Sequence, residues 1–145
     1  MLPRRLQAVV ETFALFSDPA ERTNLLLDYA DQFREVPASV ATRPFARDHL
    51  VPHCESEAYV WAVAQPDGTL TLYFAVENPS GISAKALATI LDRSLSGLTP
   101  AEIATVPADV VEQIFRQNLS MGKGLGLMSM VQAVTALARR AARRE

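Results

Sequence analysis

The sequence predicts an α+β fold in which a small antiparallel sheet is covered by helices. Residues 57–64 and 69–76 are rich in β-branched and aromatic side chains, and Pro66-Asp67-Gly68 between them is typical of a hairpin turn. On both sides of this hairpin, apolar residues recur at helical spacing. A chain of 145 residues fits one domain and can bury a core without disulfides or metal ions. We therefore expect a single domain over residues 1–145.

Two helices are expected before the hairpin. The first stops at Ser17 and has an apolar face formed by Leu6, Val9, Val10, Phe13 and Phe16. Asp18-Pro19-Ala20-Glu21 is a capping-box pattern with proline at the first helical position, so it should open the second helix. Pro37 should end that helix near Val36, because the residue before a proline disfavours helical geometry. The short joint predicts that the two helices pack as a hairpin.

Residues 38–53 are expected to form a long loop. They show no sustained periodicity, and Pro44 and Pro52 interrupt what little there is. Long loops in compact domains are often functional. The strand pair that follows this loop would be marginally stable alone in water. We therefore expect helices to cover one face of the hairpin and a third strand to join the sheet.

Three helical segments are expected between the hairpin and residue 120. The first is closed by Gly97, and its apolar face consists of Ile82, Ala86, Leu87, Ile90 and Leu91. Thr99-Pro100-Ala101-Glu102 repeats the capping-box pattern and opens a short helix that Pro107 ends. The third is built on Val110, Val111, Ile114 and Phe115. Residues 120–126 are predicted to be a glycine-rich loop that leads into a last helix.

The glycine-rich segment raises the question of phosphate binding, because glycines before a helix can cradle an anion. Its pattern does not fit a P-loop. Gln117 stands where the first glycine is needed, Gly124 stands where serine or threonine should follow Lys123, and no strand precedes the segment. A flexible loop that presents Lys123 is the simpler interpretation.

Charge and composition exclude several classes of function. The formal net charge of −2 gives no general attraction to nucleic acid, and the arginines near the end of the chain, at 139, 140, 143 and 144, are typical of a solvated helix terminus. No apolar run is long enough to span a bilayer, and no signal-peptide pattern is present, so we expect a cytoplasmic protein without membrane or nucleic-acid partners. One cysteine and two histidines cannot form an internal disulfide or a zinc cluster.

Cys54 is the leading candidate for chemistry, because it lies where the long loop becomes the first strand. Its neighbours at 52, 53 and 55–57 mostly prefer water, so the thiol should be exposed or lie in a shallow pocket rather than in the core. Protonated His53 could lower the pKa of the thiol, although an ordinary solvated histidine remains an alternative. A catalytic dyad of Cys54 with His49 or His53 would lack a third, orienting group.

Several motifs together resemble the SufE family of sulfur-acceptor proteins. They are Cys54-Glu55-Ser56 followed by Tyr59, Phe33-Arg34-Glu35-Val36-Pro37, Leu98-Thr99-Pro100-Ala101-Glu102-Ile103, and Gly126-Leu127. The resemblance covers nearly the whole chain and rests on their order and spacing. It implies a SufE-like α+β protein whose cysteine, Cys54, accepts persulfide sulfur from a cysteine desulfurase. Such a protein stimulates that enzyme and passes sulfur to an iron–sulfur scaffold complex.

The resemblance also implies which parts the partner supplies. The desulfurase cleaves the carbon–sulfur bond of cysteine with its own pyridoxal phosphate, so no cofactor and no metal are expected in this chain. His53, His49, Ser56 and Lys123 are the residues expected to surround the thiol or to contact a partner. Lys123 should pack near the Cys54 loop and either stabilise the thiolate or contact an acidic partner surface.

The chain departs from the family at four of the compared positions, which indicates a divergent member. The family usually has glycine at His53, asparagine at His49, tryptophan at Tyr59 and arginine at Lys123. Loss of the glycine restricts the backbone beside the thiol. The competing hypothesis is a thiol-based redox sensor or a non-catalytic adaptor that carries no sulfane sulfur. A sensor would usually keep a second, resolving cysteine, which this sequence lacks.

Overall fold

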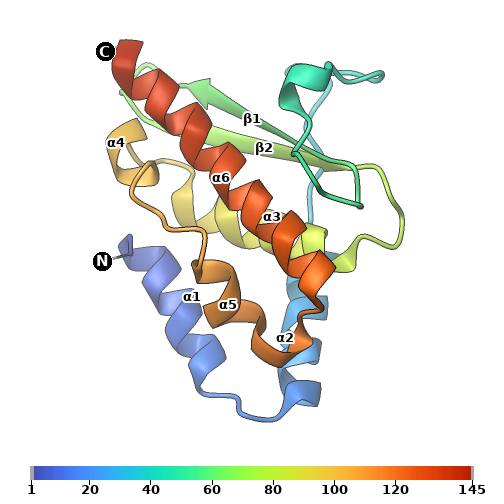
Figure 1. Ribbon diagram of the computed structural model, residues 1–145. Coiled ribbons are helices and arrows are strands. Elements are labelled where there is room, and N and C mark those ends of the chain that lie inside the picture. Colours follow the sequence, from blue (N-terminus) through green and yellow to red (C-terminus); the bar gives the residue numbers. More distant parts are fainter. Residues whose placement is uncertain (1, 145) are drawn as a thin grey trace.

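The computed structural model describes residues 2–144 and has the predicted α+β fold, a small antiparallel sheet packed with helices (Figure 1). In chain order its elements are α1 (Arg4–Ala14), α2 (Pro19–Asp31), the 3-10 turn η1 (Arg47–His49), β1 (Ala58–Ala64), β2 (Leu70–Val76), α3 (Ile82–Leu95), α4 (Pro100–Ile103), α5 (Val110–Phe115), the 3-10 turn η2 (Arg116–Asn118) and α6 (Met121–Arg144). Over the residues described, none of these helices is long and apolar enough to cross a membrane.

The two strands form the expected antiparallel hairpin, in a register that runs from Ala58 opposite Val76 to Ala64 opposite Leu70. The prediction of a third strand is wrong for the part of the chain that the structure describes, where the sheet has two strands. Single bridges replace it at the edges, such as the one between Glu35 and Phe74. There the Val36 N–H donates to the carbonyl of Phe74 (2.8 Å). Pro37 follows and has no N–H to continue the pairing.

Helices cover one face of the hairpin, as predicted. In Figure 1, α6 runs diagonally across β1 and β2, and it packs on β1 while α3 packs on β2. The opposite face is covered by the long loop, whose Phe45 ring lies 5.1 Å from that of Trp61 and 5.2 Å from that of Tyr59. Both faces of β1 are therefore buried, which explains why this strand is apolar on both sides.

Helices α1 and α2 do not form the predicted helical hairpin. They splay apart from their joint in Figure 1, and each packs against α3 instead. The side chain of Arg22, in α2, is fully buried near the joint between the two helices. The guanidinium donates to the carbonyls of Phe13 and Phe16 at the end of α1 and to that of Ile114 in α5. It thereby joins α2 to α5 and to the segment in which α1 ends.

The segment at 120–126, predicted as a glycine-rich loop, is instead largely helical, because α6 begins at Met121. Ser120 starts the helix in the manner of an N-cap: its Oγ accepts from the Lys123 N–H (3.3 Å), and its carbonyl accepts from the Gly124 N–H (2.9 Å). Glycine weakens a helix by only about 1 kcal/mol relative to alanine, and a cap together with packing offsets that cost. Lys123 therefore projects from the first turn of a helix.

Candidate functional site

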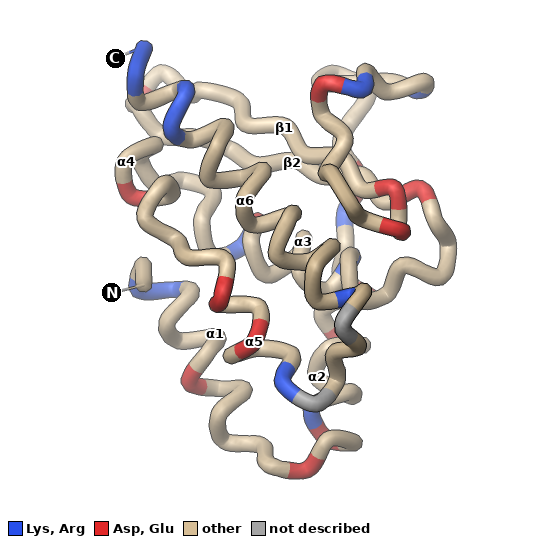
Figure 2. Tube along the Cα trace, in the orientation of Figure 1, with Lys and Arg blue, Asp and Glu red and all other residues tan. Residues whose placement is uncertain are grey.

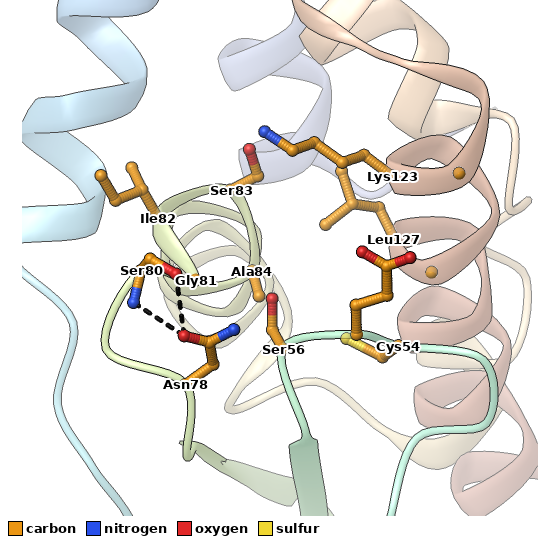
Figure 3. Close-up of a pocket in the computed structure, with 13 residues that line it drawn as sticks. Cys54, Ser56, Asn78, Ser80, Gly81, Ile82, Ser83, Ala84, Lys123 and Leu127 are labelled. Atoms are coloured by element: carbon orange, nitrogen blue, oxygen red, sulfur yellow. Dashed lines mark hydrogen bonds between the residues drawn. The ribbon is translucent and has the colours of Figure 1, made fainter.

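A cavity of about 380 Å³ opens where three segments of the chain meet. Figure 3 shows them: the Cys54 loop, the connection from β2 into the first turn of α3, and the start of α6. The residues that line the cavity are Cys54, Glu55, Ser56, Asn78, Ser80, Gly81, Ile82, Ser83, Ala84, Gly122, Lys123, Gly126 and Leu127. The cavity thus joins residues that lie far apart in the sequence around the single thiol.

Cys54 is half-buried. It begins a tight turn in which the carbonyl of Cys54 accepts from the Glu57 N–H (3.1 Å). The residues on either side of this turn, His53 and Glu57, have positive φ angles of 60° and 50°. Residues other than glycine rarely adopt this left-handed conformation. The loop therefore departs from ordinary backbone geometry on both sides of the thiol, which is typical of functional segments.

Gly126 lets α6 approach the backbone of this turn. A Cβ at position 126 would lie 3.1 Å from the carbonyl oxygen of His53 and 3.3 Å from Cα of Cys54. Both distances are shorter than ordinary contacts, so a larger residue would push the loop and the helix apart. The glycine in the Gly126-Leu127 motif therefore has a physical role, since it holds the Cys54 turn against α6.

Ser56 anchors the loop to the start of α3. Its carbonyl accepts from the Asn78 N–H (3.1 Å). A Cβ at Gly81 would lie 2.9 Å from the Oγ of Ser56, so this contact also requires a glycine. The Cys54-Glu55-Ser56 step thus places the thiol on the cavity wall and fixes the loop two residues later.

Lys123 lines the same cavity from the first turn of α6. Figure 3 shows its side chain extending over the cavity toward Ser83 rather than toward the sulfur of Cys54. The residue is exposed. The structure therefore brings Lys123 and Ser56 together with Cys54 around one cavity, and it leaves the ammonium group open to solvent.

The two histidines lie outside this cavity. His49 and His53 line a second cavity, of about 440 Å³, between the long loop and the middle of α6. The Nδ1 of His49 lies 3.0 Å from the carbonyl oxygen of Val60, and its ring stacks on Trp61. His53 precedes Cys54 in the chain but lines a different cavity. The structure therefore forms no dyad between Cys54 and either histidine.

Asn78 and Ser83 also line the Cys54 cavity, although no sequence motif points to either residue. The Asn78-Pro79-Ser80-Gly81 sequence is typical of a turn, and asparagines in turns often fold their side chains back on the backbone. No local signal relates this turn to Cys54, because the contact depends on how the hairpin and α3 pack together.

The charges around the cavity are mixed, because Glu55 lines it beside Cys54 while Lys123 and the start of α3 lie on its other sides. Gly81 is the N-cap of α3 and provides no side-chain cap, and of the first-turn amides the Ile82 N–H donates to the carbonyl of Ser80 (2.9 Å). Lys123 adds a positive charge on the α6 side. Figure 2 shows that the arginines at the other end of α6 lie far from this point. Residues 2–144 contain no cluster of histidine, cysteine and carboxylate groups that could hold a metal ion.

Fold and site together define a small α+β domain that presents one cysteine in an open cavity between a strand-entry loop and two helix starts. The chain belongs to the SufE family: the model of this family, described as an Fe-S metabolism associated domain, matches residues 7–138. The resemblance seen in the sequence motifs is thereby confirmed, and the chain is associated with iron–sulfur metabolism.

The fold is shared with a solved structure of unassigned function. The solution structure of a hypothetical protein from Thermus thermophilus matches with a TM-score of 0.79 and 24% sequence identity, over 99% of this chain and 99% of that one. Likeness at this level of identity concerns the fold alone. No curated protein gives a significant match to the chain.

Proposed function

We propose that this protein is a sulfur acceptor that takes persulfide sulfur from a cysteine desulfurase onto Cys54. It would stimulate that enzyme and pass the sulfur toward an iron–sulfur scaffold complex. The observation that carries this proposal is the half-buried thiol of Cys54 on the wall of an open cavity, in a chain of the SufE family. We place the activity in the cytoplasm, where reducing conditions keep a lone cysteine free.

The transfer step is a thiol–disulfide type of exchange. The thiolate of Cys54 attacks the terminal sulfur of the desulfurase persulfide, and a bond forms between this sulfur and Sγ of Cys54. The bond from that sulfur to the desulfurase cysteine breaks, and the enzyme leaves as a thiolate. No external oxidant or reductant is needed, because the transferred sulfur keeps its oxidation state. The chain supplies a nucleophile, and the partner's pyridoxal phosphate cleaves the carbon–sulfur bond of free cysteine.

The cavity suits the product of this step. A volume of about 380 Å³ has room for the added sulfur atom beside Cys54. The transferred group is an anion near neutral pH, because a persulfide is more acidic than a thiol. The N-terminal end of α3 favours an anion there, whereas Lys123 is exposed and Glu55 brings a negative charge to the same cavity.

The proposal is tested by intact mass spectrometry of the protein after incubation with a cysteine desulfurase and cysteine. We expect the wild type to gain the mass of one sulfur atom, and Cys54→Ser to gain none while unfolding at the same urea concentration. A wild type that gains no sulfur in the presence of an active desulfurase would favour an adaptor or a redox sensor instead.

A further inference from the structure

The half-buried residue Asn78 lines the Cys54 cavity at the point where β2 leads into α3. Its N–H donates to the carbonyl of Ser56 (3.1 Å), and its own carbonyl accepts from the N–H of Gly81 (3.0 Å). One bond ties Asn78 to the loop that carries Cys54, and the other ties it to the start of α3. The position of Asn78 relative to the thiol loop is therefore set by the backbone.

The orientation of its side-chain amide is also fixed. The Oδ1 of Asn78 accepts from the N–H of Ser80 (3.0 Å) and from its hydroxyl (2.8 Å). A backbone N–H can only donate, so the oxygen of the amide must face Ser80. In Figure 3 the amide nitrogen points away from Ser80, toward the Ser56 and Cys54 side of the cavity. Within the described residues this nitrogen donates no hydrogen bond, so a directed donor remains available beside the cavity.

This arrangement favours an anion in the cavity over a neutral group. The Nδ2 of Asn78 is a pure donor and has no acceptor to offer. A hydrogen bond to a charged acceptor is roughly twice as strong as one between neutral groups. A persulfide extends Cys54 by one sulfur atom and carries its negative charge on that atom. A donor on the cavity wall would therefore stabilise the charged persulfide more than the neutral one.

We infer that Asn78 is a catalytic residue of this site, an inference that rests on the proposed function. Its Nδ2 donates a hydrogen bond to the anionic terminal sulfur of the Cys54 persulfide. Ser80 acts as the positioning residue, because it holds the amide oxygen and thereby directs the nitrogen. The bond forms without any proton leaving Asn78, and the sulfur stays the nucleophile for the next transfer.

Asn78→Asp is the variant that tests this role with the least change in shape. Aspartate keeps an oxygen that accepts from the N–H of Ser80, but it replaces the donor with a carboxylate oxygen. We expect the pH at which the Cys54 persulfide becomes half-reactive toward iodoacetamide to rise by about one unit. The rise combines the lost hydrogen bond with repulsion from the added carboxylate, and a shift of one unit corresponds to about a tenfold loss in persulfide reactivity below that pH.

The persulfide for this test is made on the isolated protein with inorganic polysulfide, which gives up one sulfur to the Cys54 thiolate and leaves as a shorter chain. The measurement is thus independent of any desulfurase. Failure of the desulfurase to load Cys54 would overturn the proposed function, whereas an unchanged pH profile in Asn78→Asp would overturn the role of Asn78. The two outcomes are therefore distinguishable.

Two further variants separate the hydrogen bond from a general effect on the turn. Asn78→Ser keeps an oxygen that can accept from Ser80 but lacks the amide nitrogen. The pH profile of its persulfide should therefore shift in the same direction as that of Asn78→Asp, by a smaller amount. It also replaces Asn78→Asp if that variant unfolds. Ser80→Ala removes the hydroxyl contact but leaves Nδ2 in place, and it should shift the profile less than either. Equal shifts in all three variants would show an effect of the turn alone and would overturn the inference.

Discussion

Gly126 and Cys54 lie in direct backbone contact, because a Cβ added to Gly126 would stand 3.3 Å from Cα of Cys54. The start of α6 and the thiol loop therefore behave as one unit, although 71 residues of chain separate them. The same helix turn brings Lys123 to the cavity. Any residue larger than glycine at 126 must move the thiol loop away from the helix.

The first prediction follows from that contact and compares Gly126→Ala with Gly124→Ala. A Cβ at 124 meets only the Cδ1 of Leu119, at 3.9 Å, so alanine there should raise the free energy of unfolding by about 1 kcal/mol through helix propensity. At 126 the same gain in the free energy of unfolding is offset, because the added Cβ displaces the Cys54 loop. Cys54 should then react faster with iodoacetamide. Equal stabilisation in both variants, with unchanged thiol reactivity, would contradict this account. Urea unfolding and alkylation rates measure the two effects.

The second prediction concerns the left-handed backbone of His53, whose φ is 60°. A residue with a Cβ is disfavoured there by about 1–2 kcal/mol relative to ordinary helical geometry, whereas glycine is not. Glycine also loses more freedom on folding, so His53→Gly should stabilise the protein by a net amount of about 0.5–1 kcal/mol. His53→Ala keeps the Cβ and should change stability by less than about 0.5 kcal/mol. Urea unfolding of both variants tests this, and a stabilising alanine would disprove the backbone explanation.

The third prediction concerns the ion pairs that hold the long loop over the outer face of the sheet. Arg43 donates to the carboxylates of Glu35 and Glu77. Its hydrogen bond lowers the pKa of Glu35 below the usual 4.5. A carboxyl group with a lowered pKa stabilises the fold above its usual pKa and loses this contribution as the pH falls through the lowered value.

Glu35→Gln should therefore destabilise the protein at pH 7, and the difference from the wild type should shrink as the pH falls below 4.5. Because both side chains are partly exposed, the effect at pH 7 should stay below about 1 kcal/mol. Urea unfolding at several pH values provides the measurement. A difference that stays constant down to pH 2 would indicate lost packing rather than a lost charge.

The fourth prediction assigns Lys123 to partner contact. The side chain is exposed and extends toward Ser83, so water screens the effect of its positive charge on the Cys54 thiol. Lys123→Ala should change the alkylation rate of Cys54 in the isolated protein by less than about twofold. It should lower desulfurase stimulation several-fold, and more at low salt than at high salt.

The matched control is Lys123→Arg, which keeps the charge and should keep the stimulation. If Lys123→Ala instead slowed alkylation of the free protein about tenfold while stimulation at saturating protein was unchanged, Lys123 would act on the thiol and not on the partner.

Much of the fold could be predicted because local signals and tertiary packing agree. Pro66-Asp67-Gly68 closes the hairpin as expected, with Gly68 at a φ of 85°. Thr99 and Glu102 form the complete capping box that their spacing predicts. The wrong prediction of a loop at 120–126 has a local and a tertiary cause. The glycines of 120–126 lie within a helix because Ser120 starts it and Gly126 packs on Cys54.

The candidate site was predictable in part for a similar reason. Cys54 and Ser56 could be selected because their motif is local, and Lys123 because the family resemblance supplied it. No sequence pattern shows that the backbone turns His53 away from the cavity of Cys54, or that Asn78 approaches it through the start of α3. Both depend on how loops separated by many residues are packed by the core.

The central claim is that Cys54 accepts sulfur directly from a persulfide on the partner enzyme. It is tested most directly by a single-turnover experiment, in which a cysteine desulfurase is first loaded with persulfide, freed of cysteine, and then mixed with an equal amount of this protein. We predict that the desulfurase loses its extra sulfur while the tryptic peptide containing Cys54 gains it at the same rate. Loss of sulfur from the enzyme as free sulfide, with no gain at Cys54, would contradict the account.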